Sequence, residues 1–208
     1  MTETEQDDLS FVREMTEAGR NAPLLGGRFY LFWGVLVSVA YVGQWAVLDG
    51  RFGLEPQTIG FIWISFGVVA GIGMPLLIRS LKNKPGRGAM NNRVETAVWV
   101  MSGFAMFSFV VGVFVATAVF GKPIWLWDFV ATIAFAGYGV SLFTSGSIAG
   151  VAWMRIPSVI ALVSAGIVPI LVATPELYLF GATVIIAVAV VPGFLLVMGE
   201  PKSLPEEA

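Results

Sequence analysis

Six long runs of uncharged, mostly apolar residues dominate the chain. They are Phe29–Leu48, Pro56–Ile78, Thr96–Gly121, Phe129–Met154, Ile156–Pro175 and Leu177–Gly199. Each run is long enough for a helix to cross a hydrocarbon core of roughly 30 Å, which takes about 20 residues. The apolar positions are continuous and do not alternate over about ten residues, as the strands of a membrane β-barrel would. The pattern predicts an all-α integral membrane protein, a bundle of six transmembrane helices.

The runs divide the chain into three regions. Residues 1–28 form an acidic N-terminal segment, residues 29–199 the six-helix transmembrane domain, and residues 200–208 a short acidic tail. In the first region Asp7 or Asp8 can cap a short amphipathic helix whose apolar stripe includes Leu9 and Phe11. We interpret this helix as lying on the bilayer or on the bundle, with docking to a partner protein as the alternative. Because the segment lacks the basic start and short apolar core of a signal peptide, we expect the first membrane helix to stay uncleaved.

Composition supports the membrane assignment and narrows the chemistry. Hydrophobic residues make up 57% of the chain and charged residues 12%, against about 25% charged in globular domains. A net charge of −2 gives no basic face for nucleic acid. The absence of cysteine and histidine removes disulfides, thiol catalysis and the usual zinc sites. Since the chain also lacks HExxH, GxSxG and Walker motifs, we expect no enzymatic activity and no cofactor.

The basic residues predict the orientation. One side of the membrane would carry nearly all of them: Arg13, Arg20, Arg28, Arg79, Lys82, Lys84, Arg87, Arg93, Arg155 and Lys202. The other side would carry only Arg51 and Lys122. Short loops rich in lysine and arginine face the cytoplasm. We therefore expect a multi-pass protein of the cell (inner) membrane with both termini in the cytoplasm.

The loop from Arg79 to Arg93 contains the densest group of these cations: Arg79, Lys82, Lys84, Arg87 and Arg93. We interpret it as the main determinant of orientation and as a contact for anionic lipid headgroups. The alternative is a docking surface for a protein partner. Acidic residues expected on the same side, Glu3–Asp8 before the loop and Glu200, Glu206 and Glu207 after it, are its candidate partners within the chain.

Prolines and tryptophans recur along the chain. Pro56, Pro123 and Pro175 stand at or just before the second, fourth and sixth helices, where a missing N–H costs nothing. At the last of these turns Thr174 is predicted to cap the helix, and Glu176 to favour its positive end. Trp33, Trp99 and Trp153 precede the three prolines at similar spacings. This favours a threefold repeat of one helical hairpin, with chance recurrence as the alternative.

Two charged residues are candidate functional groups in the membrane domain. Arg155 is the only charge between Phe129 and Pro175. It either faces the bundle, where an unpaired arginine is costly, or marks the interfacial start of the fifth helix. Asp128, at the outer end of the fourth helix, is interpreted as a helix cap, with an outward-facing cation site as the alternative. Arg155 and Asp128 should lie near opposite faces of the membrane.

Other polar residues have mainly structural interpretations. Glu95 is predicted to precede the third helix as an acid favoured by the helix dipole. Gln44 and Tyr138 are expected to be deep, where they would hydrogen-bond neighbouring helices or line a narrow polar path.

Small residues predict where helices approach closely. Gly67 and Gly71 form a GxxxG pattern in the second helix, Gly112 begins a related pattern in the third, and Gly137 one in the fourth. Such residues mark packing faces within one chain or between chains. The second helix is expected to break near Gly71, Gly73 and Pro75, and the sixth at Pro192–Gly193.

Two functional hypotheses follow. The first is a membrane subunit or regulator without enzymatic activity, acting through a protein partner or a homo-oligomer. The alternative is a small transporter or channel with a path near Arg155 and the two broken helices.

Overall fold

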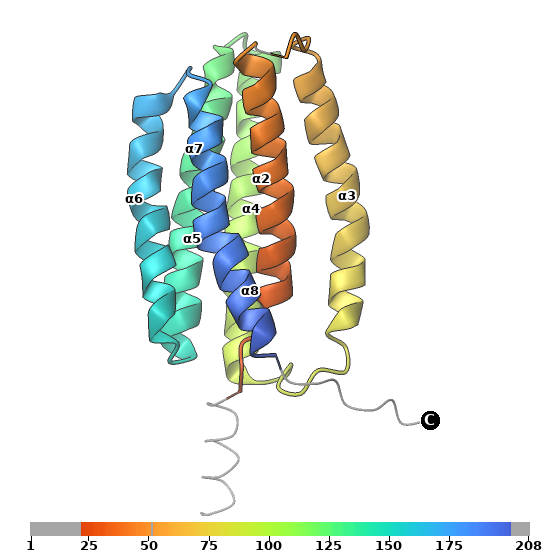
Figure 1. The fold of residues 1–208 in the computed structure, drawn as a ribbon, viewed down its shortest axis with the longest axis vertical. Helices are drawn as coiled ribbons and strands as arrows, with labels where there is room; N and C mark the ends of the chain where they lie inside the picture. The colour runs from red at the N-terminus through yellow and green to blue at the C-terminus, as the bar shows by residue number, and fades with distance from the viewer. Residues whose placement is uncertain (1–21, 51, 201–208) are drawn as a thin grey trace, which may run out of the picture.

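The computed structural model describes residues 22–50 and 52–200, which form helices and turns without a β-strand. Six helical segments are long and apolar enough to cross a membrane, and they lie side by side in one bundle (Figure 1). The predicted six-helix membrane bundle is confirmed. The short helix predicted near the N-terminus and residues 201–208 of the predicted tail lie outside the described residues.

The six spans follow one another with short connections. They are α2 (Gly27–Leu48), α3 (Thr58–Ser80), α4 (Met90–Ala118), the 3₁₀ turn η1 (Ile124–Asp128) with α5 (Phe129–Ile148), the 3₁₀ turn η2 (Ala152–Met154) with α6 (Arg155–Leu171), and a last span made of α7 (Glu176–Ile185), the π-helical segment η3 (Ile186–Val190) and α8 (Val191–Met198). The last span therefore changes its helical geometry halfway along.

α2 is the central helix of the bundle. It packs against α3, α7, η3 and α8, whereas α5 packs against α4 and α6. α6 connects these two groups through its contacts with α7 and η3. Between them lies the core, with Phe135, Leu142, Val168 and Val188 fully buried. α3 and α4 are peripheral and expose most of their apolar surface, which lipid covers in a membrane.

Glycines bring α2 and the last span into backbone contact. A Cβ placed on Gly193 would lie 2.6 Å from Leu31 N, and one on Gly34 would lie 2.8 Å from Val190 Cγ2. Neither position has room for a side chain, so the two helices meet closely. The last span is irregular, but not where a break was predicted: the π-helical segment covers Ile186–Val190, and α8 continues through Pro192 and Gly193.

The break predicted in the second helix is wrong. α3 continues through Gly71, Gly73 and Pro75 to Ser80. A proline removes only one backbone hydrogen bond of the helix. A bilayer offers no other partner for the remaining backbone groups, so a helix keeps the rest of its hydrogen bonds.

The prolines stand where the sequence places them, but the predicted cap does not form. Pro56, Pro123 and Pro175 lie at or just before the starts of α3, η1 and α7. The hydroxyl of Thr174 donates to Leu171 O at 2.8 Å. It therefore bonds back to the end of α6 and does not cap α7.

The three hairpins are not equivalent in their packing. Trp33 and Trp99 lie inside α2 and α4, but Trp153 lies in η2, ahead of α6. α2 is central, whereas α4 and α6 both pack against α5. The threefold repeat stays a prediction.

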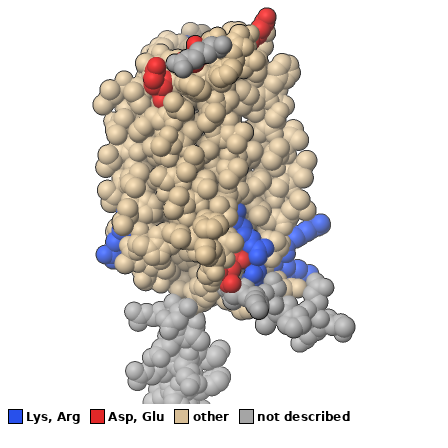
Figure 2. All heavy atoms as spheres, in the orientation of Figure 1, with Lys and Arg blue, Asp and Glu red and all other residues tan. Residues whose placement is uncertain are grey.

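Charge is distributed unevenly between the two ends of the bundle. Figure 2 shows lysine and arginine gathered at one end, next to both ends of the described chain. We call this the basic end. It holds the loop Leu81–Ala89 and the turn between α5 and α6. Among the described basic residues, only Lys122 lies at the opposite end.

Candidate functional site

One asparagine holds the chain entering α2 against the start of α4. The amide Nδ2 of Asn92 donates to Pro23 O at 3.0 Å and to Gly86 O at 2.9 Å. Its Oδ1 accepts from Leu25 N at 2.9 Å. Asn92 is buried, and these bonds use both donors and the acceptor of its amide. A single side chain thus connects the N-terminal entry, the basic loop and α4.

A buried carboxylate lies one helical turn further along α4. Glu95 is 4% exposed, and its Oε1 accepts from the Tyr30 hydroxyl at 2.5 Å. The Tyr30 hydroxyl in turn accepts from Trp99 Nε1 at 2.7 Å, with the two rings 4.8 Å apart. A Cβ on Gly26 would lie 2.4 Å from Glu95 Oε1, so a side chain at Gly26 would make the carboxylate shift. We call Asn92, Glu95, Tyr30 and Trp99 the α2–α4 lock.

The predicted role of Glu95 at a helix start is wrong. α4 begins at Met90, so Glu95 lies inside the helix and points into the bundle. The helix begins before Arg93 and Glu95. Burial of the Glu95 carboxyl group is possible because the Tyr30 hydroxyl donates to it.

A second buried carboxylate fixes part of the basic loop. Glu200 bonds Arg28, with Nη2 to Oε2 at 2.9 Å, and Lys84, with Nζ to Oε2 at 3.2 Å. The Glu200 side chain is 3% exposed and that of Lys84 7%. Glu200 is therefore a partner of the basic loop, as predicted, while Glu3–Asp8, Glu206 and Glu207 lie outside the described residues. The other cations of the group, Arg79, Lys82, Arg87 and Arg93, are exposed.

Asp128 joins three elements at the end opposite the basic end. It is 6% exposed, and its Oδ1 accepts from the Tyr178 hydroxyl at 2.5 Å. Its Oδ2 accepts from Ala173 N at 2.7 Å. Its side chain makes no capping bond to α5, so the predicted cap is wrong. Both oxygens instead bond to the turn between α6 and α7 and the helix that follows it, a contact that no local sequence pattern reveals.

Gln44 and Tyr138 lie inside the bundle as expected. Gln44 Oε1 accepts from Trp63 Nε1 at 2.7 Å, which connects α2 to α3. The Tyr138 ring packs edge-on against Trp99 at 5.0 Å. Both side chains therefore contact neighbouring helices, as the first of their two interpretations predicted.

Arg155 is exposed and is the first residue of α6, at the basic end. This position is a helix start and not a bundle-facing arginine; its place at the membrane interface stays a prediction. Arg155 and Asp128 lie at opposite ends of the bundle, as predicted. No three of the described acidic residues come close enough together to hold a metal ion.

The predicted packing glycines divide into two groups. A Cβ on Gly137 would lie 3.6 Å from Ser102 Cβ, so this glycine lies at the contact of α5 with α4. Gly67, Gly71 and Gly112 face open space in the single chain. Packing between chains at these three positions stays a prediction.

The residues that sequence reasoning missed are Tyr30, Asn92 and Trp99. Their one local signal is the polar pair Asn91–Asn92, four residues before the apolar run that begins at Thr96, an uncommon place for two buried amides. The chain matches no protein-family model, no curated protein and no solved structure.

Proposed function

We propose that this multi-pass membrane protein is an inner-membrane interaction subunit without enzymatic activity, which binds an acidic segment of a partner protein at its basic end. The observation that carries the proposal is a fixed loop with outward-facing cations. Asn92 bonds the loop at Gly86, and Glu200 bonds it at Lys84. Lys82 and Arg87 are exposed in this loop, and Arg79 is exposed at the adjoining end of α3.

A fixed loop is favourable for binding because ordering a mobile loop costs free energy on association. Here contacts within the chain already order the loop in the folded protein, so binding has less of it left to order. Cations that stand in a defined arrangement can steer and select a partner of opposite charge. The basic end therefore has the physical properties of a docking surface in addition to those of an orientation signal.

The orientation follows from the same charges. Cytoplasmic loops carry an excess of lysine and arginine, so we place the basic end, and with it both termini, in the cytoplasm. A two-fold dimer through this surface would set like charges against each other. An acidic segment of a different protein is therefore favoured over a second copy of the chain.

The transport alternative has less support. Arg155 is exposed at one end of the bundle, and α3 is unbroken. The irregular last span packs directly against α2 at Gly193, which leaves no space between them there. Both deeply buried carboxylates in the spans, Glu95 and Asp128, are held by tyrosine hydroxyls.

A photo-crosslinking amino acid at Gly88, exposed in the loop, tests the proposal in native membranes. We expect one protein adduct, which is lost when Arg79, Lys82 and Arg87 are all changed to Glu. The matched control is Arg155→Glu, which reverses an exposed charge at the same end outside the loop and should leave the adduct intact. Adducts with lipid alone, or a protein adduct that persists in the triple variant at an unchanged membrane level and orientation, would refute the docking function.

A further inference from the structure

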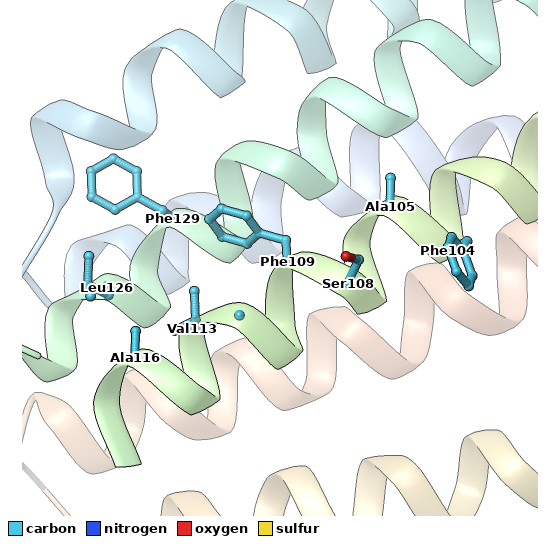
Figure 3. Close-up of a pocket in the computed structure, with 9 residues that line it drawn as sticks. Phe104, Ala105, Ser108, Phe109, Val113, Ala116, Leu126 and Phe129 are labelled. Atoms are coloured by element: carbon cyan, nitrogen blue, oxygen red, sulfur yellow. The ribbon is translucent and has the colours of Figure 1, made fainter. Parts of the chain in front are cut away.

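A groove runs along the outside of α4 on the membrane-facing surface. It has a volume of about 700 Å³ and lies between α4 and the η1–α5 segment (Figure 3). On α4 the small residues Ala105, Ser108, Gly112 and Ala116 line it together with the larger Phe104, Phe109 and Val113, and Leu126 and Phe129 line the opposite wall. Only Ser108 brings a polar side chain to this lining. An occupant must therefore be apolar along most of its length.

The groove has the length of one membrane leaflet. From Phe104 to Ala116 the α4 wall covers about 18 Å at 1.5 Å per residue. Half of a hydrocarbon core of roughly 30 Å is about 15 Å. The α4 lining ends at Phe104, near the middle of α4 (Met90–Ala118), so the groove covers one half of the membrane, on the side opposite the basic end. A lipid acyl chain fits this extent, whereas a transmembrane helix would need a contact surface across both leaflets.

A basic residue, Lys122, follows closely after the last α4 residue of the groove. The backbone N–H of Lys122 donates to Ala116 O at 3.0 Å, so its side chain starts beside the last lining residue of α4. Lys122 is exposed and makes no ion pair with a described residue. Trp125, 42% exposed, packs its ring against Phe129 at 6.1 Å. Tryptophan prefers the headgroup level of the membrane, which places this end of the groove where lipid phosphates lie.

We propose that the groove is a binding site for one anionic phospholipid of the leaflet opposite the basic end. One acyl chain lies along Ala105–Ala116, and the phosphate group lies at Lys122. The apolar walls and leaflet-long extent recognise the chain, and the single cation at the mouth recognises the headgroup. This site is separate from the basic end and does not depend on the proposed docking function.

The test uses native mass spectrometry of the full-length protein released from nanodiscs. The nanodiscs contain phosphatidylglycerol and phosphatidylcholine with identical acyl chains. We expect wild type to retain one phosphatidylglycerol in preference to phosphatidylcholine. Lys122→Gln should reduce this preference about fivefold, the effect of one basic residue near a lipid headgroup.

Two glycine variants separate groove binding from general lipid contact. Gly112→Leu places a side chain inside the groove, and Gly103→Leu places the same side chain elsewhere on α4. Both glycines face open space, so neither variant should disturb folding. We expect Gly112→Leu to lose the retained lipid and Gly103→Leu to keep it.

Three results would overturn the proposal. The first is equal lipid retention by the two glycine variants, and the second is a wild type that retains both lipids alike. The third is a wild-type dimer that Gly112→Leu converts to a monomer, because the groove would then hold a second copy of the chain.

Discussion

The α2–α4 lock makes a prediction that two tyrosines of the same bundle can test. Tyr30 and Tyr138 both pack against the Trp99 ring, at 4.8 and 5.0 Å. The Tyr30 hydroxyl makes two side-chain hydrogen bonds, to Glu95 and from Trp99. Tyr138 contacts the same ring edge-on, outside this pair of bonds. Replacing each tyrosine with phenylalanine removes one oxygen and leaves the ring contact in place.

We expect Tyr30→Phe to lower the free energy of unfolding by about 1–3 kcal/mol. Hydrogen bonds between membrane helices contribute about 0.6 kcal/mol on average and up to about 1.7 kcal/mol, and two bonds are lost. Tyr138→Phe should change stability by less than about 0.5 kcal/mol, as substitutions outside such features do. The assay is reversible unfolding in mixed micelles, followed by circular dichroism. Equal effects of the two substitutions would refute the lock.

A double-mutant cycle assigns the effect to the Tyr30–Glu95 pair. Glu95→Gln keeps an acceptor of similar shape and should cost less than Tyr30→Phe. The double variant should be more stable than the sum of the single effects predicts, by about 0.5 kcal/mol or more, because groups in contact couple. Additive effects would show that the hydroxyl and the carboxyl group contribute independently.

Three further predictions concern other parts of the bundle. Asp128→Ala should lower the free energy of unfolding by about 1–3 kcal/mol in the same assay, because the Tyr178 hydroxyl and the Ala173 N–H lose their acceptor. An unchanged free energy would show that these two bonds do not stabilise the bundle. Ala173 has a φ of 63°, a conformation that is strained for alanine and not for glycine. Ala173→Gly should therefore raise the free energy of unfolding by about 0.5 kcal/mol, because the strain relieved exceeds the entropy that glycine adds to the unfolded chain. A lower free energy of unfolding would refute this. Because the chain contains no cysteine, Gly88→Cys and Lys122→Cys can each be labelled selectively with a membrane-impermeant thiol reagent. The cysteine at position 88 should react only from the cytoplasmic side and the one at position 122 only from the other side. The reverse pattern would show that the predicted orientation is wrong.

Properties that depend on length and composition could be predicted from the sequence. A run of about 20 apolar residues can satisfy its backbone inside a bilayer only as a helix, so six such runs lead directly to six spans. The gathering of arginine and lysine at one end could also be predicted, because successive loops of a multi-span chain alternate between the two sides of the membrane. The position of Arg155 at a helix start followed the same rule.

Predictions failed where the partner of a residue lies on another helix. Gly67 and Gly71 match the favoured spacing for close packing, yet they contact no other helix of the chain, while Gly34 and Gly193, which were not predicted as packing positions, bring two backbones together. Spacing reveals that a small face exists but not whether a neighbour lies against it. The interpretation of Asp128 failed for the same reason, since a helix-start acid can turn to its own backbone or to another helix.

The sequence by itself determined the number of membrane spans, their approximate limits and the end of the bundle that carries the positive charge. These depend on the free energy of single segments in lipid and at its surface. Only the tertiary structure decided that Glu95 belongs to a lock with Tyr30, that Glu200 holds Lys84, and that the outside of α4 is grooved beside Lys122. Lipid is as apolar as the side chains it surrounds, so hydrophobicity does not select which helix faces pair. That selection comes from backbone fit and from hydrogen bonds between residues that are distant in the chain.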